Sequence, residues 1–350
     1  MGKLKKLTGY RLFLPLSCLI IVLLINLITT PTFFRITINN GVLYGYIIDV
    51  INRASELVVL AVGMTLVVSA SAGTDISVGA VMAVAAAVCT RVLAGGEVSV
   101  NEYANPYVLA VLAALAAAVV CGGFNGLLVA KLKIQPMVAT LILFTAGRGI
   151  SQLVTNGQIT YIRVDGYKLL GNNIPGIPIP TPIFVAVIVV VLTYILLKKT
   201  AMGMYIQSVG INERASRLVG LKSVKIIWMA YAFCGLCAGI AGLVASSRIY
   251  SADANNIGLN MELDAIAAVA LGGNSLGGGR VSLLGSVIGA YTIQALTTTL
   301  YAMSVPADQI PVYKAIVVIL IVAVQSEELK KFRKRLASRH SSKNVEGGVA

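Results

Sequence analysis

Long blocks of apolar residues, separated by short polar stretches, run through the whole chain. Most blocks approach the ~20 residues with which a helix crosses a bilayer while satisfying its own backbone hydrogen bonds. The blocks span residues 12–28, 57–68, 78–92, 108–130, 138–154, 183–197, 226–245, 281–300 and 312–324. A shorter apolar segment, 262–271, is counted with them. The pattern predicts an all-α fold, a polytopic membrane helix bundle of about ten transmembrane helices.

Composition supports a lipid environment. Hydrophobic residues make up 57% of the 350 residues and charged residues only 12%, with a mean hydropathy of +0.86. A soluble domain carries about 25% charged residues, because its surface faces water. This chain has too little charge to cover such a surface, so we expect lipid around most of it.

Basic residues are concentrated in four polar segments: 1–11, 131–133, 198–225 and 327–350. With ten crossings all four fall on one side, and an excess of Lys and Arg marks the cytoplasmic side of a membrane. The acidic loop residues of the other side are Glu97, Glu102, Asp165 and Asp253. We therefore predict an N-in, C-in orientation. Topology and lipid contact then account for the net charge of +14, and no nucleic-acid partner is expected.

This topology divides the chain into three regions. Residues 1–11 form a cytosolic N-terminus, 12–326 the transmembrane domain, and 327–350 a basic cytosolic tail. The longest cytosolic loop is 198–225. The first apolar block is long and is followed by no clear small-residue cleavage site, so we interpret it as an anchor helix rather than a signal peptide.

Two glycine-containing interruptions separate apolar blocks. One is 69–75, with the sequence SASAGTD, and the other is 271–280, with the sequence LGGNSLGGGR. Pairs of such interruptions in the two halves of a transporter mark broken helices that line a cavity. The alternative is that both are short cytosolic turns, and spacing alone leaves the two interpretations open.

Residue types suited to catalysis or metal binding are scarce. The single histidine, His340, lies in the basic tail, so neither a His-based metal site nor a catalytic triad is available. The chain has no G-x-x-x-x-G-K-[ST] phosphate loop, which argues against ATP hydrolysis by this chain. Cys234 and Cys237 have the spacing of a redox motif without its thioredoxin-like context. We expect no enzyme activity and no metal or cofactor bound by this chain.

Polar side chains within apolar blocks are costly and usually face an interior. Asp75 precedes an apolar block, and we favour a role as a cap for the next helix over contact with a ligand. Gly122, Gly123 and Gly126 permit close helix contact, with Asn125 donating a hydrogen bond across the interface. Packing is again favoured for Asn125, and direct ligand binding is the alternative.

A series of motifs gives the chain a specific resemblance. In order they are GMTLV at 63–67 leading to DISVG at 75–79, NG at 125–126, QPMVATL at 135–141, VGINERASRLVG at 209–220 and ELDAIAAVALGGNSLGGG at 262–279. Together they resemble the ribose/galactose/arabinose-type ABC sugar importer permease family over nearly the whole chain. Within that family the segments 48–54, 146–149, 156–159 and 252–256 are most similar to galactofuranose-type permeases.

One departure from the family pattern lies just before Asp75. The family usually has a Gly-Gly-Ile-Asp-Leu-Ser run, whereas this chain reads SAGTDIS at 71–77, one residue longer upstream. An extra residue turns a helix by about 100°. We therefore expect the path near Asp75 to differ from that of the relatives.

The resemblance implies a permease subunit of a binding-protein-dependent importer for a monosaccharide, galactofuranose or another furanose or pentose, in the bacterial inner membrane. ATP and Mg would be bound by a separate ABC ATPase subunit. The other expected partners are an extracytoplasmic sugar-binding protein, a second permease of the same or a related sequence, and membrane lipid. The alternative is an ion-gradient-driven secondary sugar transporter, which explains the helix count but not the long 198–225 loop.

The resemblance also implies two sets of functional residues. The segment 202–221 is expected to hold a coupling helix that sits in an ATPase groove, bracketed by Gly210 and Gly220. A solvated surface helix is the alternative. Expected coupling residues, with a Glu213–Arg217 pair and a Leu218–Leu221 apolar contact, are Gly210, Asn212, Glu213, Arg214, Arg217, Leu218, Gly220 and Leu221. Candidate residues of the translocation path are Asp75, Ser77, Asn125, Gln135, Thr140, Asp264 and Asn274.

Overall fold

The computed structural model describes residues 12–39 and 41–325. The predicted cytosolic N-terminus and the predicted basic tail with His340 lie outside the described residues. The helices are α2 (Phe13–Thr29), α3 (Tyr46–Ser71), α4 (Val78–Ala94), α5 (Tyr107–Ala130), α6 (Pro136–Val154), α7 (Thr181–Lys199), α8 (Met202–Ile211), α9 (Glu213–Leu218), α10 (Ser223–Ile249), α11 (Met261–Leu271), α12 (Leu283–Ala302) and α13 (Ile310–Gln325), with the 3-10 helices η1 (Pro31–Phe34) and η2 (Asp165–Leu169).

Each of the ten apolar segments of the sequence overlaps one helix. Six of the described helices are long and apolar enough to cross a membrane, namely α3, α5, α6, α7, α10 and α12. Shorter apolar helices are Pro15–Thr29, Val78–Ala94 and Ile310–Leu320. With 11 residues, α11 is about 16 Å long, roughly half of a hydrocarbon core of about 30 Å. The chain is therefore a helical membrane protein, as predicted, and its helices include short ones.

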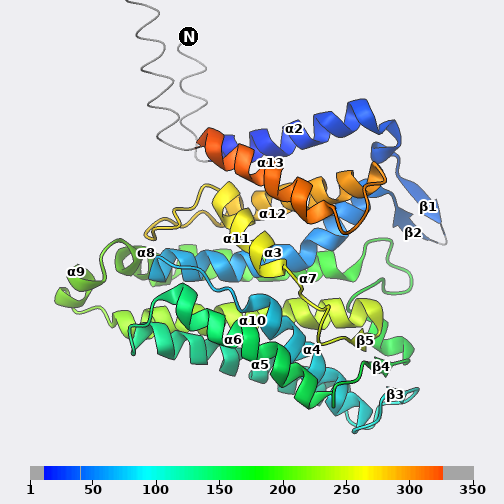
Figure 1. Ribbon diagram of the computed structural model, residues 1–350, viewed down its shortest axis with the longest axis horizontal. Coiled ribbons are helices and arrows are strands. Elements are labelled where there is room, and N and C mark those ends of the chain that lie inside the picture. Colours follow the sequence, from blue (N-terminus) through cyan, green and yellow to red (C-terminus); the bar gives the residue numbers. More distant parts are fainter. Residues whose placement is uncertain (1–11, 40, 326–350) are drawn as a thin grey trace, which may run out of the picture.

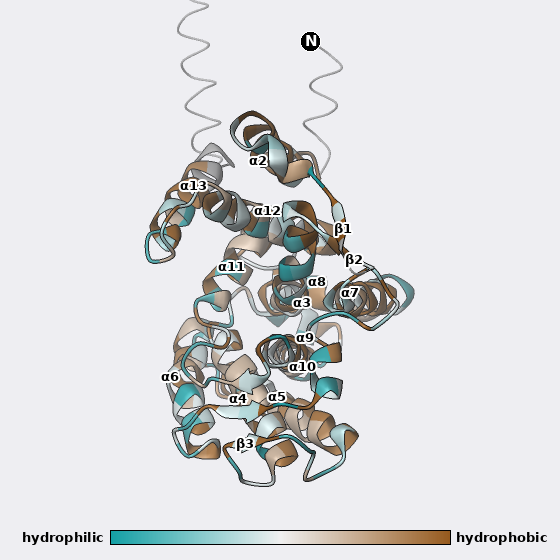
Figure 2. Ribbon diagram, turned by 90° about the vertical axis from the view of Figure 1, so that its right-hand side faces the viewer, coloured by the Kyte–Doolittle hydropathy of each residue, from teal (hydrophilic) through white to brown (hydrophobic). Residues whose placement is uncertain are grey.

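The core of the bundle is built around α3 and α10. Helix α3 packs against α7, α8, α10, α11 and α12, and α10 packs against α4 and α5 as well. Figure 2, which looks along the helices, shows α3 between α10 and α12. In contrast, α5 and α7 turn large apolar side chains such as Val120 and Leu192 outward. Such an outward-facing apolar surface is what lipid contact requires.

Small residues let the central helices approach closely. Gly122 of α5 and Gly235 of α10 face each other, and a Cβ atom added to Gly235 would lie 2.9 Å from the Cα atom of Gly122. Gly63 of α3 likewise packs against Cys234 and Cys237 of α10. Both cysteines are buried free thiols, so these two small residues pack on one helix face.

The description of the fold as all-α needs a correction, because the loops contain two small sheets. Strands β1 (Thr37–Asn39) and β2 (Val42–Tyr44) form an antiparallel hairpin. Strand β4 (Thr160–Ile162) pairs in parallel with β3 (Ser99–Val100) and antiparallel with β5 (Ser251–Ala252). Strands of two or three residues in polar loops are too short to leave an alternating pattern in the sequence.

The strands and the short helices lie at opposite ends of the bundle (Figure 1). Helices α8 and α9 lie at the left of that view, and all five strands lie at the right. Helix α2 begins and α13 ends at the same end as α8 and α9. The two ends are therefore distinct, one helical and rich in lysine and arginine, the other built from short strands.

The glycine contact between α5 and α10 can be tested by adding one methyl group. The substitution Gly235→Ala forces Cβ into the backbone of α5, and overpacking of this kind costs about 1–3 kcal/mol. We expect a lower midpoint of thermal unfolding in detergent. The matched control is Gly149→Ala in α6, where an added Cβ has nothing within 4 Å, so the midpoint should not fall. Equal midpoints for the two variants would contradict the close contact.

Candidate functional site

The first interruption folds back into the bundle. Helix α3 ends at Ser71, and Ala72 follows in the left-handed region with φ 53°. The chain then returns along α3, so that the Asp75 amide lies 3.4 Å from the Met64 Sδ atom. Met64 precedes the end of α3 by seven residues, or about 10 Å of helix. The interruption is therefore a re-entrant segment rather than a turn at the surface.

The departure from the family pattern upstream of Asp75 falls in a segment, 71–77, that is mostly not helical. Residues 72–77 are not helical, and α4 begins only at Val78. A residue inserted in this non-helical segment lengthens the turn, whereas an insertion within a helix would rotate everything after it. A path near Asp75 that differs from that of the relatives stays a prediction.

Four of the seven path candidates form one buried cluster at the start of α4. The Asp75 Oδ1 atom accepts hydrogen bonds from the Ser77 amide (2.9 Å) and the Ser77 hydroxyl (2.7 Å). The Asn125 side-chain amide donates to the Ser77 hydroxyl at 2.8 Å. The Thr140 hydroxyl accepts from the Ile76 amide at 3.1 Å. These bonds give partners to the amides of Ile76 and Ser77. The capping interpretation needs a correction, because Asp75 bonds to the N-cap residue Ser77, and α4 itself has no side-chain cap.

The cluster retains one unused acceptor. Among the described residues, the buried Asn125 Oδ1 atom has no hydrogen-bond partner. A buried polar atom without a partner costs free energy, so such atoms mark places where a ligand or water can bind. Asn125 therefore fits both packing and ligand contact, the two interpretations that its sequence allowed.

The second interruption, 271–280, is hydrogen-bonded through Ser286 to α3. The Asn274 side chain donates to the Ser286 hydroxyl (2.8 Å) and accepts from the Ser282 amide (2.7 Å). The Ser286 hydroxyl is in turn 2.6 Å from that of Thr65. Thr65 follows Met64 directly, so the two interruptions meet α3 at one level. Of these partners, Ser286 lies outside every sequence motif and Thr65 was not singled out.

Two path candidates lie away from both clusters. The Asp264 carboxylate forms an ion pair with Lys314 at 2.7 Å, joining α11 to α13. Gln135 is exposed at the N-cap of α6, where Pro136 packs against Gly73. The structure therefore groups Asp75, Ser77, Asn125 and Thr140, and it separates Gln135, Asp264 and Asn274 from them.

The first turns of α4 and α11 meet inside the protein. A Cβ atom added to Gly79 in α4 would collide with two groups. One is the carbonyl oxygen of Gly258, in the loop before α11, and the other is the carboxylate of Glu262, in the first turn of α11. Glu262 is 3% exposed, and its Oε2 atom has no partner among the described residues. A carboxylate at helix N-termini is stabilised by the unpaired amide groups there. Glu262 belongs to the motif at 262–279, but sequence spacing does not indicate this convergence.

Helix α6 holds the loop before α11. The Arg148 guanidinium donates to the carbonyl oxygens of Ala254 (2.9 Å) and Ile257 (2.5 Å). The Gln152 side chain donates to that of Asn255 at 2.7 Å. The segments 146–149 and 252–256, both of which carry the resemblance to galactofuranose-type permeases, thus contact each other.

The expected coupling segment consists of two helices, α8 and α9, separated at Asn212. The Asn212 side chain accepts a hydrogen bond from the Ala215 amide at 2.9 Å and caps α9. Gly210 was expected at the start of the coupling helix. This prediction needs a correction, because Gly210 lies within α8. An added Cβ at Gly210 would collide with the Ser69 carbonyl oxygen. Gly220 follows the end of α9 with φ 85°.

Ion pairs fix α9 to the neighbouring loop. The Glu213 carboxylate binds Lys133 of the α5–α6 loop and Arg217 one turn later, the latter at 2.6 Å. It also accepts from the Ser223 hydroxyl at 3.2 Å. Partial burial opposes ionisation of Glu213, but the hydrogen bonds and charges of Lys133 and Arg217 outweigh it and hold the pKa of Glu213 below its usual range. The carboxylate is therefore ionised at neutral pH.

Two large apolar residues at the C-terminal end of α9 are uncovered, Leu218 at its last position and Val219 at its C-cap. The exposed fraction of Leu218 is 89% and that of Val219 is 77%, while Arg214 is also exposed. The predicted apolar pair needs a correction, because Leu221 packs against the core instead of projecting outward. Leu218 therefore projects with Val219 rather than with Leu221.

The second interruption also touches the end of α3 and the end of α8. The Gly279 amide donates to the Ser69 carbonyl oxygen (3.1 Å), and the Ser69 hydroxyl donates to the Arg280 carbonyl oxygen (2.8 Å). A Cβ atom added to Gly279 would collide with Ile211, which directly precedes Asn212. Backbone contacts therefore connect α3 to the segment that leads into α9.

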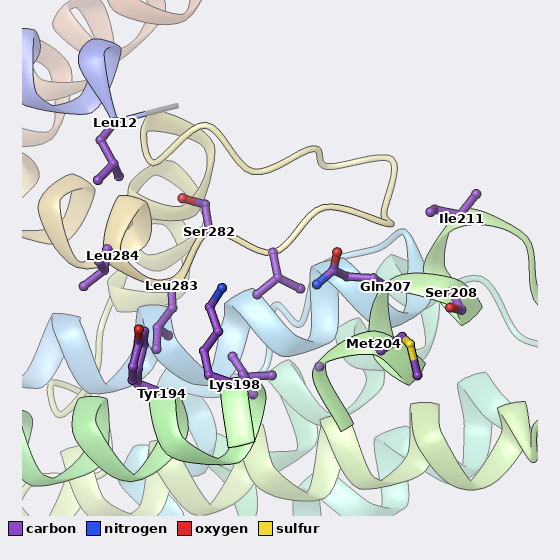
Figure 3. Close-up of a pocket in the computed structure, with 13 residues that line it drawn as sticks. Leu12, Tyr194, Lys198, Met204, Gln207, Ser208, Ile211, Ser282, Leu283 and Leu284 are labelled. Atoms are coloured by element: carbon purple, nitrogen blue, oxygen red, sulfur yellow. The ribbon is translucent and has the colours of Figure 1, made fainter. Parts of the chain in front are cut away.

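A cavity of about 810 Å³ lies beside α8 (Figure 3). Its walls come from α7, α8 and the start of α12, and Lys198 and Gln207 point into it. None of the path candidates lines this cavity. It does not reach the Asp75 cluster, but it adjoins the second cluster, because Ser282 lines it and also bonds to Asn274.

Comparison with known proteins identifies relatives along nearly the whole chain. The family model described as branched-chain amino acid transport system / permease component matches residues 46–325. The galactofuranose transporter permease of Escherichia coli (strain K12) is 44% identical over 324 residues, covering 93% of this chain and 92% of the relative. No solved structure matches.

Two further relatives are import permeases. The fructose import permease of Bifidobacterium longum (strain NCC 2705) is 37% identical over 355 residues, covering 99% of this chain and 96% of the relative. The ribose import permease of Escherichia coli (strain K12) is 35% identical over 318 residues, covering 89% and 93%. Similarity of this extent covers both interruptions and the α8–α9 segment.

The hydrogen bond from the Ile76 amide to Thr140 can be tested with an isosteric change. In Thr140→Val the partly buried Ile76 amide loses its acceptor, which costs about 1–3 kcal/mol. We expect a lower midpoint of thermal unfolding. The matched control is Thr145→Val one turn later in α6, whose exposed hydroxyl bonds only the Leu141 carbonyl of its own helix. If both variants unfolded at the midpoint of the unaltered protein, Thr140 would have no role in holding the interruption.

Proposed function

Because this chain belongs to the family of branched-chain amino acid transport system permease components, we propose that it is the permease subunit of a binding-protein-dependent ABC importer for a monosaccharide. The three relatives are named for galactofuranose, fructose and ribose, which supports a sugar rather than the amino acid of the family's description. The similarity to import permeases favours this function over an ion-gradient-driven secondary transporter. Galactofuranose or another furanose or pentose is the proposed substrate.

The observation that carries the coupling role is the uncovered apolar end of α9. A helix of six residues has little stability of its own, yet α9 is capped by Asn212 and fastened by Lys133 and Ser223. A fixed helix that projects Leu218 and Val219 is suited to a hydrophobic groove of a partner. We assign that groove to a cytosolic ABC ATPase subunit, which would bind ATP and Mg and carry the enzymatic activity.

The sugar path is assigned to the interior beside α3. Asn125 Oδ1 and Glu262 Oε2 are buried acceptors without partners among the described residues, and sugar hydroxyls are donors that such atoms can bind. Few polar groups suffice for a permease, because selectivity can rest on an extracytoplasmic sugar-binding protein. A second permease, of the same or a related sequence, would complete the path.

The proposed orientation places α8 and α9 in the cytosol of a bacterium and the strands outside its inner membrane. Lys133 of the α5–α6 loop pairs with Glu213 of α9, and α2 begins and α13 ends at that same end (Figure 1). This arrangement supports N-in, C-in topology and about ten helical crossings or partial crossings. The extracytoplasmic sheet would then face the sugar-binding protein.

The contacts at the end of α3 suggest how ATP would act on the path. A shift of α9 moves Ile211 and, through Gly279 and Ser69, the end of α3 that both interruptions contact. ATP and the loaded binding protein must favour different states of the bundle for such a shift to drive transport. Closure of the ATPase would open the path outward, and hydrolysis would restore the inward-facing state.

The coupling role can be tested by charging the exposed end of α9. With Leu218→Asp, an apolar contact is replaced by a charge that the ATPase groove must desolvate, and loss of a central interface residue costs about 2 kcal/mol or more. We expect at least a roughly tenfold loss of ATPase subunit that co-purifies with the tagged chain from its native host. The matched control is Val98→Asp, an exposed apolar residue at the opposite end. Undiminished ATPase in the Leu218→Asp preparation would refute the assignment.

The energy source separates the proposal from its rival. In cells that express the complete importer, we expect sugar uptake to stop when ATP is depleted and to continue when only the proton and sodium gradients are collapsed. Uptake is measured with radiolabelled galactofuranose, ribose and fructose in parallel. Uptake that follows the ion gradients at constant ATP would overturn the ABC assignment.

A further inference from the structure

An apolar cleft of about 450 Å³ opens between the end of α5 and the start of α10. Leu127 and Ala130 line it from α5, and Val224 and Trp228 line it from α10. The cleft is distinct from the α3 clusters and from the cavity beside α8. It lies at the same end of the bundle as α9, because Lys222, which also lines it, directly precedes α10.

The cleft exists because two glycines of α5 leave room for an indole ring. A Cβ atom added to Gly126 would lie 3.1 Å from Trp228 Cδ1, and one added to Gly123 would lie 3.3 Å from Trp228 Cζ2. The ring therefore lies against the backbone of α5, while 41% of Trp228 stays exposed. Tryptophan is enriched where a membrane helix meets the headgroup layer.

Three lysines surround this apolar cleft. Lys131, Lys222 and Lys225 line it, and all three are exposed. No acidic residue lines the cleft, and no ion pair among the described residues involves any of the three. The start of the 27-residue helix α10 adds partial positive charge at the same place. A ligand that fits must combine negative charge with apolar chains.

We propose that this cleft binds one anionic phospholipid. The phosphate would lie among Lys131, Lys222 and Lys225, and an acyl chain would lie against Leu127 and Trp228. Basic pockets between membrane helices at the headgroup level bind acidic lipids in this way. The binding of the lipid is inferred from the cleft alone, whereas its effect on α9 rests on the proposed function.

The position of the cleft gives the bound lipid a role in holding α9. Lys222 lies between α9 and α10, four residues after Leu218, and Ser223 contacts both Glu213 and Arg217. Glu213 is bonded by Lys133, in the same loop as Lys131, and by Ser223, which directly follows Lys222. A phosphate that binds Lys131 and Lys222 would therefore restrain both segments that hold Glu213. An acidic lipid would thereby order the segment that meets the partner.

Trp228 is the only tryptophan in the chain, so its fluorescence reports on this cleft alone. The full chain is reconstituted into phosphatidylcholine vesicles that contain either dibrominated phosphatidylglycerol or dibrominated phosphatidylcholine at equal mole fraction. Bromine quenches the indole on contact. We expect phosphatidylglycerol to be favoured over phosphatidylcholine about fivefold or more in relative binding constant, given the attraction of several lysines for acidic lipid.

The matched variants change two lysines each. Lys222→Gln with Lys225→Gln should bring the relative binding constant close to one, whereas Lys198→Gln with Lys199→Gln at the end of α7 should leave it unchanged. Size-exclusion profiles and helix content establish that the variants fold. Equal quenching by both lipids in the unaltered chain would overturn the proposal. So would an equal effect of the two variants, since general surface charge would then explain it, or no quenching by either lipid, since protein would then cover Trp228.

Discussion

Backbone groups buried within a membrane bundle need partners from the protein itself, and this constraint organises the structure around α3. Where α4 and α11 begin inside the bundle, helical hydrogen bonding stops and other donors and acceptors take over. Asp75 and Thr140 supply acceptors for amides of the first interruption, and the Asn274 side chain accepts from the Ser282 amide at the second. Both sets of bonds reach α3 at the adjacent residues Met64 and Thr65, so one buried helix supports both interruptions.

The sequence predicted the helices well because each apolar block must satisfy its own backbone hydrogen bonds in lipid. It could not predict the short strands, which carry no periodic signal, nor the depth of the interruptions, which depends on how far the chain returns along α3. In the candidate site, Asp75 and Ser77 were predictable as neighbours in one motif. Asn125 and Thr140 were chosen from other motifs, but only folding brings them to Asp75. The partners Thr65 and Lys314 are ordinary residues in apolar segments, and no spacing singles them out.

The α8–α9 segment is linked to the bundle interior through glycines. Gly210 and Gly279 have no side chains, so the ends of α3 and α8 and the second interruption meet by direct backbone contact. Backbone contacts have little freedom to yield, unlike long side chains that can change rotamer. Displacement at one element is therefore passed to the next with small loss, as the proposed coupling to an ATPase outside the membrane requires.

The uncovered end of α9 also bears on how the chain is made and handled. Leu218 and Val219 face water as long as nothing covers them, and exposed apolar patches promote self-association and recognition by chaperones and proteases. Copies of this subunit made in excess of the protein that covers this patch would keep it exposed. Those copies would be degraded faster than assembled ones. The abundance of the assembled complex would then follow the scarcer component, and stoichiometry would be set by quality control as well as by synthesis.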